Sequence, residues 1–501
     1  MIALIKKKRS GKIKGRAVAD GSRQRVYMNK DEVTSPTIHL ESLILSMVID
    51  GHERRDVATC DVTGAFLIPD IDSFIIIKLD GDMVDIMCDA NNKYKNYVTY
   101  ECGKKVLYMR LLKSLYGIMQ AALLWYRTFV KCLKDDGFKI NKYDPCIANK
   151  IINGKQCTIC WHVDDTKISH VDKNVVSKVI NNIEKEFGIM TVTRGKEHVF
   201  VGMNFKLNED GTVSISMNDY IEECIASYGE EISKNNTKTP ANSKLFNVDV
   251  HSTRLNEDKS EIFHHIVAKL LFVMKRVRLD ISTTIAFLSS RVTKSTKVDW
   301  VKLKRLLEYL YNTKNMERII GMDGLSIMKT YVDASYAVHP DMRGHSGGLI
   351  TVGKGVIHIK TNKQKLNTKS STEIELVAAS DYIPWTVWIT KVLYEQGYGV
   401  DSTFFQDNEN AIRMEKYGLK SCGDKSRHIN IRYFFIKDIL DRENISVKHC
   451  RSEEMIADFL TKPLQGTLFK RMRSIIMGHA LFPAEERVGK YINGKAVDEQ
   501  T

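Results

Sequence analysis

The chain has 501 residues, of which 43% are hydrophobic and 27% are charged, so it holds enough apolar side chains for a buried core. Its length predicts three or so modules rather than one. A formal net charge of +14 indicates a polyanionic partner, most simply nucleic acid. No apolar run approaches 18 residues, and the ten cysteines are scattered, so we expect an intracellular protein with no membrane span.

Two short motifs each have two interpretations. The basic opening "MIALIKKKRSGKIKGR" fits a nuclear address, and it fits equally well basic strands that face phosphate. Cys157 and Cys160 form a C-x-x-C pair, but zinc would need a second such pair. Alternation along a strand also places the two thiols on opposite faces, which favours a role without metal.

The first half of the chain mixes strands with helices. "DVATCDVTGAF" reads as a strand, and "AALLWYRTFVKCLKDDGF" reads as an amphipathic helix that ends at Gly137. Asn153-Gly154 lies between two apolar, β-rich runs and predicts a tight hairpin with positive φ at both residues.

The second half changes pattern twice. A loop-rich junction near 232–260 precedes consecutive helices over about 261–314. From about residue 326 we expect three strands, a long helix from Ser371, a strand, a helix, a strand and a final helical turn. This order predicts a mixed α/β sheet with helices packed on it.

Two adjacent carboxylates, Asp164 and Asp165 in "CTICWHVDDTKISH", follow the predicted hairpin in a turn between two strands. Such a pair is stable either around a cation or in an open, solvated turn. A rigid strand-turn-strand suits Mg²⁺. Asp61, at the end of the strand in "CDVTGAF", supplies a third carboxylate if its strand neighbours theirs, and alone it would be an ordinary strand-end residue. Three such groups would bind two divalent ions that activate a primer 3′-hydroxyl and steady the triphosphate.

Six motifs occur in order over about two hundred residues: "KGRAVADGSRQ", "DVTGAF", "LYGIMQAALLWY", "YDPCI", "HVDD" and "FVGMNF". Together they resemble the reverse transcriptase of copia-type retrotransposons, and the resemblance continues to about residue 475. It implies an α/β (α+β) fold, with a right-hand polymerase followed by a ribonuclease H-like mixed-sheet domain. The implied boundaries are 1–215 for fingers and palm, 216–320 for a mainly helical thumb and connection, 321–465 for the ribonuclease H-like domain, and 466–501 for a tail, helical at first and then disordered.

The resemblance also implies roles for single residues. Asp61, Asp164 and Asp165 are the catalytic metal ligands of the palm. Phe66 excludes a ribose 2′-hydroxyl, and its alternative is an ordinary core phenylalanine. The other implied substrate contacts are Gln120 for the incoming nucleotide, Lys14 and Arg16 for the triphosphate, and Gly202 in the hairpin that steadies the primer end. The alternatives are a polar loop residue for Gln120 and a solvated charged face for the two cations.

Two positions depart from the pattern of this family. The family usually has tyrosine at His162 and proline at Ala122. His162 is partly cationic and precedes the acidic pair by two residues, so it is expected to shift their electrostatics. Neither departure removes a metal ligand, but both bear on activity.

A second acidic set lies in the C-terminal half, in the order expected of the copia-type ribonuclease H: Asp333, Glu375, Asp407 and Asp458. Converging, they would hold two Mg²⁺ ions, one generating hydroxide and one supporting the leaving oxygen. The alternatives are a helix cap for Asp407 and a surface position for Asp458. Glu373 is expected to complete a capping box with Ser370. His428 and His449 are weaker candidates for substrate contact and product release, and packed polar residues are the more ordinary outcome.

The leading interpretation is RNA-directed DNA synthesis from deoxynucleoside triphosphates together with removal of RNA from the RNA/DNA hybrid. It implies two Mg²⁺ per active site, with Mn²⁺ as an alternative. The implied partners are an RNA template, a DNA primer, the hybrid and other products of the same polyprotein. The implied location is cytoplasmic particles, the nucleus or both. The alternatives are a decayed element that binds nucleic acid without catalysis, and a chain in which only the nuclease survives.

Overall fold

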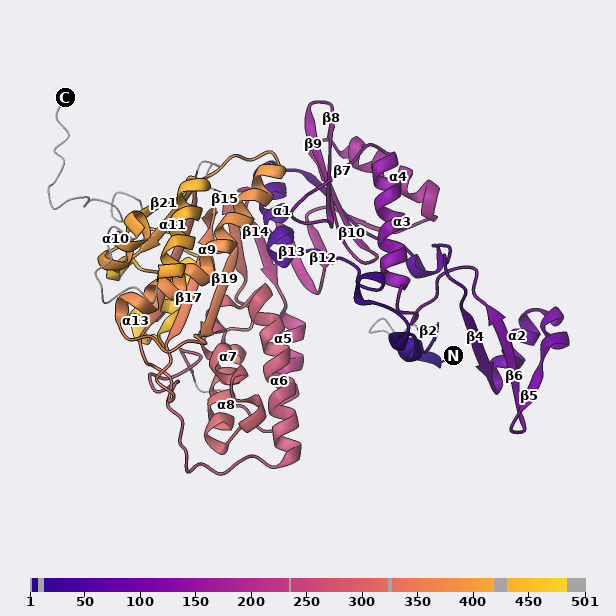
Figure 1. Cartoon of the computed structure of the whole chain (residues 1–501), viewed down its shortest axis with the longest axis horizontal. Helices are drawn as coiled ribbons and strands as arrows, with labels where there is room; N and C mark the ends of the chain where they lie inside the picture. Colours follow the sequence, from indigo (N-terminus) through magenta and orange to yellow (C-terminus); the bar gives the residue numbers. More distant parts are fainter. Residues whose placement is uncertain (1, 8–12, 234–235, 323–326, 419–429, 484–501) are drawn as a thin grey trace. The chain divides into compact units, whose positions relative to one another are not determined.

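In the computed structural model of the chain, the described residues are 2–7, 13–233, 236–322, 327–418 and 430–483 (Figure 1). They form an α/β fold, as expected from the sequence. The chain divides into two compact units, Met1–Ile38 with Asp56–Arg194, and His39–Arg55 with Gly195–Thr501. The boundaries at 215, 320 and 465 remain predictions, and the contacts within the chain divide it at other points.

The first unit is built on a six-stranded antiparallel sheet with the order β11-β3-β10-β9-β8-β7. Its strands are β3 (Asp56–Asp61), β7 (Lys139–Ile140), β8 (Ile147–Ile152), β9 (Lys155–His162), β10 (Asp165–His170) and β11 (Thr191–Arg194). Helices α3 (Ala121–Asp135) and α4 (Lys173–Phe187) pack beside it (Figure 1). The buried face of α4 carries Val176, Val179, Ile180 and Ile183, whose spacing places them on one side of a helix.

The predicted hairpin in this sheet is confirmed. Asn153 and Gly154 join β8 to β9 with φ of 52° and 73°, the positive values that a two-residue hairpin loop favours. The next connection, from β9 to β10, has φ of 61° at Val163, which is unusual for a β-branched residue. Trp125 of α3 donates its indole N–H to the Val163 carbonyl at 2.6 Å and so holds this second turn.

Smaller elements complete the first unit. The hairpin β1 (Ile2–Lys7) and β2 (Ile13–Val18) lies at the N-terminus. A three-stranded sheet of β4 (Ile76–Asp80), β6 (Lys104–Arg110) and β5 (Thr99–Glu101) carries α2 (Asp82–Ala90). Helix α3 ends at Asp135, and Gly137 follows with φ of 84°, close to the predicted end.

The two cysteines of the C-x-x-C pair, Cys157 and Cys160, are both buried on β9, and neither is part of a disulfide. No metal-ligand cluster of the described residues contains them. Both side chains are fully buried in the core of the sheet.

The second unit begins with the sheet β12-β13-β14-β15-β18 and a group of helices. The strands are β12 (Glu197–Phe200), β13 (Met203–Leu207), β14 (Val213–Ser216), β15 (Arg318–Met322) and β18 (Gly353–Lys354). The helices are α5 (Asn218–Ala226), α6 (Glu257–Arg276), α7 (Ser282–Ser289) and α8 (Lys297–Asn312), which confirm the consecutive helices expected near 261–314.

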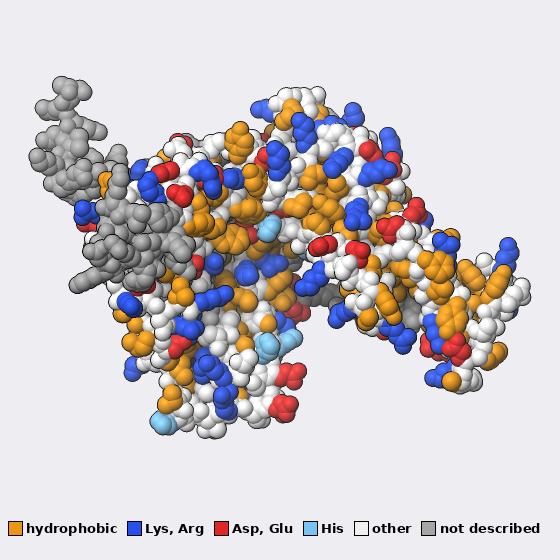
Figure 2. Space-filling model, viewed as in Figure 1, with side chains coloured by type: hydrophobic (Ala, Val, Ile, Leu, Met, Phe, Trp, Pro, Cys, Tyr) orange, Lys and Arg blue, Asp and Glu red, His pale blue; other side chains and the backbone are white. Residues whose placement is uncertain are grey.

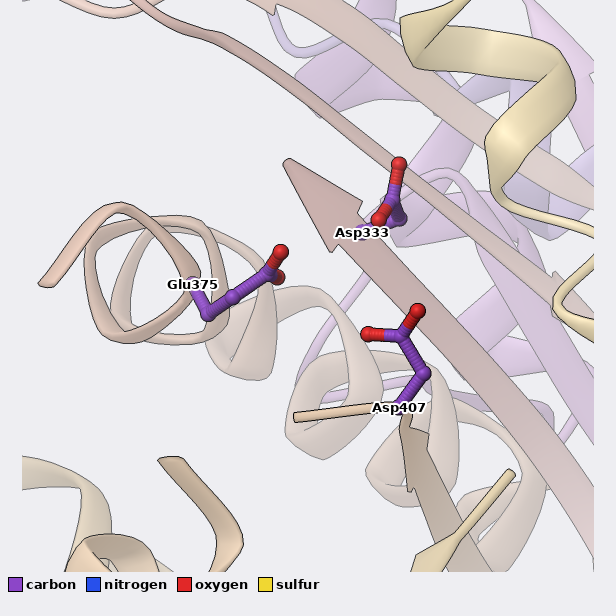
Figure 3. A group of neighbouring side chains, drawn as sticks. All are labelled: Asp333, Glu375 and Asp407. Atoms are coloured by element: carbon purple, nitrogen blue, oxygen red, sulfur yellow. The ribbon is translucent and has the colours of Figure 1, made fainter. Parts of the chain in front are cut away.

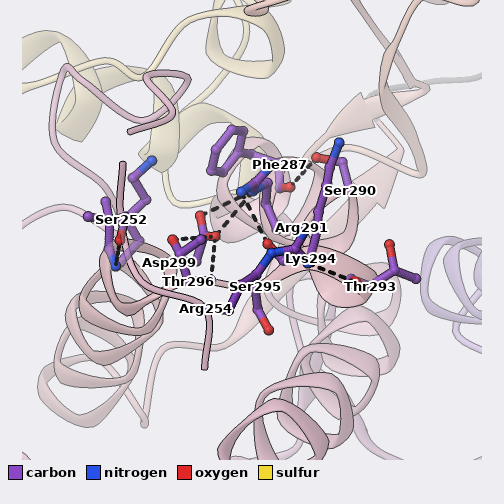
Figure 4. Close-up of polar contacts among 12 residues, drawn as sticks. Ser252, Arg254, Phe287, Ser290, Arg291, Thr293, Lys294, Ser295, Thr296 and Asp299 are labelled. Carbon is purple, nitrogen blue, oxygen red and sulfur yellow. Dashed lines mark hydrogen bonds and ion pairs between the residues drawn. The ribbon is translucent and has the colours of Figure 1, made fainter. Parts of the chain in front are cut away.

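A polar cluster fixes the start of α8 (Figure 4). Arg291 and Asp299, both nearly buried, form an ion pair with 3.2 Å between Nε and Oδ2. The same carboxylate oxygen accepts hydrogen bonds from the Thr296 backbone N–H and hydroxyl, each at 3.0 Å. The carboxylate thus closes a capping box and neutralises a buried guanidinium at once.

The C-terminal part is a mixed sheet, as the sequence predicts, and its strands lie in the order β19-β17-β16-β20-β21. Strand β16 is antiparallel to β17 and parallel to β20, and β20 is parallel to β21. Its elements are β16 (Ile327–Ser335), β17 (His345–Thr351), β19 (His358–Lys363), α9 (Ser371–Glu395), β20 (Asp401–Gln406), α10 (Glu409–Tyr417), α11 (Asn430–Arg442), β21 (Ser446–His449), α12 (Asp458–Thr461) and α13 (Gly466–Ile476). Two helices, α10 and α11, lie between β20 and β21 where the sequence predicted one.

Helix α13 lies in the segment assigned to a tail, and its first part is helical as expected. Phe469, Met472 and Ile476 on this helix are buried. Residues 466–476 therefore belong to the core of the second unit rather than to a tail. The rest of that segment lies outside the described residues from 484 onward.

Helix α1 (Leu40–His52) precedes β3 in the chain but folds with the C-terminal part, against β14, β15 and α9. Its sequence is apolar on nearly every side, which is typical of a helix buried all round. Glu41 forms an ion pair of 2.9 Å with Nδ1 of His358, and the His358 ring stacks on Trp385 at 4.3 Å between centroids. Of the helices that the structure describes, none has the length and apolar character needed to cross a bilayer.

Candidate active sites

The three carboxylates of the first unit come together at one end of the central sheet. Asp61 ends β3 and lies directly opposite Asp165, the first residue of β10. Asp164 occupies the turn before β10, and its carbonyl accepts a hydrogen bond of 3.4 Å from the Val62 N–H. The expectation that the strand of Asp61 neighbours the acidic hairpin is therefore confirmed.

The negative charges of the three carboxylates act on one another, and the pKa of Asp165 reflects this. Burial raises the pKa of the half-buried Asp165, and the negative charges of Asp164 and Asp61 raise it further. His162 opposes the rise, as expected for a partly cationic neighbour. The departure from the family pattern at His162 thus adds a compensating charge to the cluster. The second departure, Ala122, is the second residue of α3, where alanine is a strong helix former.

Tyr116 is a functional candidate that the sequence did not single out. Its ring makes an edge contact with Phe66 at 5.2 Å between centroids, and the Arg16 guanidinium lies 5.3 Å over it. Burial raises the pKa of its phenol, Arg16 lowers it, and the charges of Asp164 and Asp61 raise it. The Tyr116 ring thus lies against Phe66 and Arg16, and its phenol is affected by the charges of Asp164 and Asp61. The signal available in the sequence was an aromatic residue immediately before the glycine of "LYG".

A close approach between the backbones of Gly117 and Ala19 fixes the position of Tyr116. Gly117 has φ of 92°, and a Cβ there would lie 2.0 Å from the Ala19 carbonyl oxygen. The Ala19 N–H donates to the Tyr116 carbonyl at 2.7 Å. Only glycine permits this contact, which ties the residues following β2 to the Tyr116 turn. Lys14 lies on β2 opposite Lys6, and its side chain is outside the described residues.

Gln120 is not found in contact with the described carboxylates. It is buried at the start of α3, and its amide N–H donates to the Ser73 hydroxyl at 2.7 Å. It lines a cavity of about 600 Å³ that also carries Tyr27, Phe74 and Arg127. Tyr27 and Phe74 are 87% and 70% exposed, so two large aromatic rings at this cavity are open to solvent.

Gly202 lies in the second unit, in the two-residue turn between β12 and β13. Its φ is 77°, that of the preceding Val201 is 49°, and a Cβ at Gly202 would lie 3.3 Å from the Phe272 ring. Arg276 of α6 donates from Nε to the Val201 carbonyl at 3.2 Å. The turn is therefore held in a strained conformation by α6.

A second acidic cluster lies where strands β16 and β20 of the mixed sheet end (Figure 3). Asp333, Glu375 and Asp407 each offer a carboxylate oxygen, and these oxygens lie within 4.8 Å of one another. Tyr331 pairs with Phe405 across the parallel strands β16 and β20, so Asp333 and Asp407, each two residues further along, reach the same edge. Glu375 points toward them from α9.

Backbone and side-chain donors support this trio. The Ala334 N–H donates to Glu375 at 3.3 Å, and the Ser452 hydroxyl donates to Asp407 at 3.3 Å. The Thr461 hydroxyl donates to Asp333. Glu373 stays apart from the trio as a helix cap, accepting from the Lys369 N–H at 2.6 Å while Ser370 accepts from Glu373.

The fourth carboxylate, Asp458, is near the trio but held by a lysine. Its charge acts on Asp333, and its own Oδ1 lies 2.6 Å from the Lys462 ammonium. His449, at the end of β21, contacts the Asp407 carbonyl oxygen through Nε2 at 3.2 Å. His428 lies outside the described residues.

The trio fits a hard divalent cation. Burial, together with the negative charge of Asp458, raises the pKa of Asp333 to about 6. The pKa of Glu375 rises well above its usual range through burial and the charges of Asp333 and Asp407. Crowded, partly desolvated carboxylates are what a cation with oxygen ligands neutralises. Asp61, Asp164 and Asp165 are gathered less tightly than this trio.

Glu415 of α10 is a buried carboxyl next to the Gln406 amide, and its charge acts on Glu375. Burial raises its pKa to about 7, and Gln406 offsets this only in part. The unfolded chain loses this proton near its ordinary value, so the folded protein loses stability as the pH rises from about 4.5 to 7.

We therefore expect Glu415→Gln to increase the free energy of unfolding at pH 8 by up to about 3 kcal/mol and to change it little at pH 5. Urea unfolding at the two pH values measures this. Glu409→Gln, at an exposed position on the same helix, is the matched control. An equal effect of Glu415→Gln at both pH values would show that its charge is not buried in the folded state.

Comparison with known proteins agrees with this geometry. Residues 3–243 match the family described as reverse transcriptase (RNA-dependent DNA polymerase). The chain is 26% identical over 476 residues to the retrovirus-related Pol polyprotein from transposon TNT 1-94 of Nicotiana tabacum. It is also 26% identical over 472 residues to the corresponding polyprotein of transposon RE1 of Arabidopsis thaliana. Residues 3–243 form a reverse transcriptase domain of the copia type.

The chain spans about a third of the length of these curated relatives. The matches cover 93% and 92% of this chain but only 34% and 30% of the tobacco and Arabidopsis polyproteins. The Transposon Ty1-ER2 Gag-Pol polyprotein of Saccharomyces cerevisiae is 23% identical over 496 residues, 26% of its own length. Among solved structures, a foamy viral protease-reverse transcriptase in complex with double-stranded DNA matches with a TM-score of 0.49 and 13% identity, over 89% of this chain and 64% of that one.

Proposed function

We propose that this chain is an RNA-directed DNA polymerase with a ribonuclease H activity on RNA/DNA hybrid. The observation that carries the polymerase is the register that pairs Asp61 with Asp165 beside Asp164, inside a reverse transcriptase domain. The observation that supports the nuclease is the buried trio of Asp333, Glu375 and Asp407 at a mixed-sheet edge.

In the polymerase, Asp61, Asp164 and Asp165 would hold Mg²⁺. Bound there, the ions would lower the pKa of the primer 3′-hydroxyl and stabilise charge on the triphosphate. The hydroxyl oxygen attacks the α-phosphorus, a new phosphodiester forms, and pyrophosphate leaves. Arg16 would meet the negative charge of the triphosphate, and its place over Tyr116 orients it.

In the nuclease, the trio would hold Mg²⁺ with Asp458 as a fourth ligand. The ions would supply a hydroxide and support the leaving oxygen. Water adds to the scissile phosphorus of the RNA strand, and the 3′-oxygen leaves with a proton. Thr461 and Ala334 fix the rotamers of Asp333 and Glu375, so the ligands are oriented before substrate binds.

The cavity beside Gln120 fits an unpaired stretch of template. Aromatic rings and arginine side chains on its border suit stacking and phosphate contact without sequence preference. Arg110 lies 5.0 Å over the Phe74 ring and presents a second cation there. Lysine and arginine side chains are also spread across the face shown in Figure 2, with acidic side chains among them.

Primer extension on a defined RNA template, with Mg²⁺ and then with EDTA, tests the polymerase. Cleavage of labelled RNA in a hybrid, under the same two conditions, tests the nuclease. Magnesium-dependent extension and cleavage are expected. Tight binding of primer-template with neither reaction would instead identify a nucleic acid-binding remnant, and cleavage alone would identify a surviving nuclease.

Phe66 offers a prediction on sugar selection. It lies in a short 3₁₀ helix, Ala65–Leu67, and is half-buried against Tyr116. Replacing Phe66 by alanine opens space for one more oxygen, so we expect discrimination against ribonucleotides to fall roughly a hundredfold.

The ratio of kcat/KM for a deoxynucleotide and its ribonucleotide measures this. Leu67→Ala, at the exposed neighbouring position, is the matched control and should leave the ratio unchanged. A Phe66→Ala enzyme that loses activity on both sugars equally would contradict the proposed role.

A further inference from the structure

Lys462 is a cation inside the acidic cluster of the proposed nuclease. Its ammonium lies 2.6 Å from Asp458 Oδ1; Asp458 begins α12, and Lys462 directly follows its last residue. Burial alone would lower the pKa of this lysine. The carboxylates of Asp333, Asp458 and Asp407 outweigh burial and raise it. The negative charges of these three carboxylates therefore act on Lys462, whose direct contact is with Asp458.

The packing of α12 fixes the lysine in this place. Gly347 pairs with Asp333 across β16 and β17, and a Cβ there would lie 2.6 Å from Leu460 Cβ. The glycine lets α12 approach the strand closely enough for Thr461 to bond with Asp333. Thr461, the residue before Lys462, is held at Asp333, and the Lys462 ammonium contacts Asp458 one helical turn earlier.

Asp458 differs from the other three carboxylates in its partner. Asp333, Glu375 and Asp407 have oxygens within 4.8 Å of one another, and Asp458 is not in that group. The Asp458 side chain is 14% exposed and the Lys462 side chain is 46% exposed, so the carboxylate end of this ion pair is shielded and the ammonium end is open to water. The fourth proposed metal ligand is thus already engaged by a protein cation.

We propose that Lys462 competes with a divalent cation for the Asp458 carboxylate and so weakens the binding of Mg²⁺ to the nuclease site. This inference rests on the proposed nuclease function. The lysine stabilises the crowded carboxylates in the absence of ions, because it neutralises part of their charge. Binding of a cation that uses Asp458 must break the ion pair or place two positive groups close together. The lysine then sets the Mg²⁺ concentration at which the nuclease becomes active.

The test uses the full chain with Lys462→Met, an unbranched neutral side chain of similar length. Both this variant and the parent carry Asp61→Asn and Asp165→Asn, so that ions at the polymerase carboxylates do not contribute. Isothermal titration calorimetry with MgCl₂ gives the dissociation constant, and thermal unfolding with and without MgCl₂ gives an independent readout.

Lys462→Met is expected to bind Mg²⁺ about tenfold more tightly than the parent, and the difference should shrink at high salt. Lys462→Arg keeps the charge and should bind like the parent. In an Asp458→Asn background the effect of Lys462→Met should disappear, because the contested carboxylate is gone. Lys462→Gln provides a second neutral variant if the methionine protein is unstable in EDTA.

Unchanged Mg²⁺ affinity in both neutral variants would overturn the inference while leaving the nuclease intact. Tighter binding that persists in the Asp458→Asn background would overturn it as well, since the lysine would then act elsewhere. A parent protein that shows no Mg²⁺ binding sensitive to Asp333→Asn, and no hybrid cleavage, would instead remove the proposed nuclease function itself.

Discussion

Replacing Asp164 by asparagine is expected to lower the rate of RNA-templated DNA synthesis by roughly a thousandfold or more. Asparagine has nearly the same size, and the turn is held independently by the bond from Trp125 to the Val163 carbonyl. The fold of the hairpin is therefore expected to survive. What is lost is one negative charge from the group proposed to hold the ions.

Single-nucleotide incorporation on an RNA template measures this, with kcat and KM determined separately. A ligand role predicts a large fall in kcat, whereas a loss of nucleic acid binding would appear as weaker primer-template affinity. Asp135→Asn, at an exposed acidic position on α3, is the control within the same unit. Synthesis above about a tenth of the parent rate in Asp164→Asn would rule out a metal-ligand role.

The same cluster predicts the direction of a pH effect. The pKa of Asp165 is raised by burial and by its two acidic neighbours. A protonated carboxyl is a poor ligand, so synthesis by the parent enzyme should fall as the pH decreases through that raised pKa. Additional Mg²⁺ should restore part of the rate, because the ion competes with the proton.

Replacing Asp333 by asparagine is expected to reduce hybrid cleavage by roughly a thousandfold while leaving DNA synthesis nearly unchanged. Asp333 accepts a hydrogen bond from the Thr461 hydroxyl, and the negative charge of Asp458 raises its pKa. Its loss removes a ligand from the centre of the cluster. Cleavage of labelled hybrid and primer extension, run on the same preparation, separate the two activities.

The same substitution should stabilise the ion-free protein. The pKa of Asp333 is raised to about 6 in the folded state, above its ordinary value of 3.8. The charged form is thus disfavoured in the folded state, and stability is lost as the pH rises through about 6. We expect Asp333→Asn to increase the free energy of unfolding at pH 8 in EDTA by about 2 kcal/mol, with little effect at pH 4.

A gain in stability together with a loss of cleavage distinguishes a site residue from a structural one. Asp401→Asn, at an exposed position at the start of β20, is the matched control and should change neither quantity. If Asp333→Asn destabilises the protein at pH 8, its carboxylate has a structural role and the assignment to the nuclease fails.

Local patterns predicted the elements that depend on neighbouring residues. Turn chemistry and apolar periodicity act over a few residues. They predicted the Asn153-Gly154 hairpin, the helices near 261–314 and the succession of strands and helices along the chain after 326. The carboxylates were found the same way, because each closes a short recognisable motif. Asp61 and Asp165 are about a hundred residues apart in the sequence, and they meet because β3 pairs with β10.

Other features were decided by packing between distant segments. The apolar sequence of helix α1 predicts only that the helix is buried. The structure shows that it packs against β14, β15 and α9. The motif identified Gln120, but only the structure shows that it is buried at the start of α3 and that its amide N–H donates to the Ser73 hydroxyl.

The sequence by itself determined the fold class, the family and the identity of seven acidic candidates, since these depend on residue types in a fixed order. Only the tertiary structure decided that Tyr116 joins Arg16 to one cluster and that Lys462 holds a member of the other. The reason is physical: a side chain's electrostatic neighbours are set by strand register and close backbone approach at glycines such as Gly117 and Gly347, and neither is encoded near the residue that feels the charge.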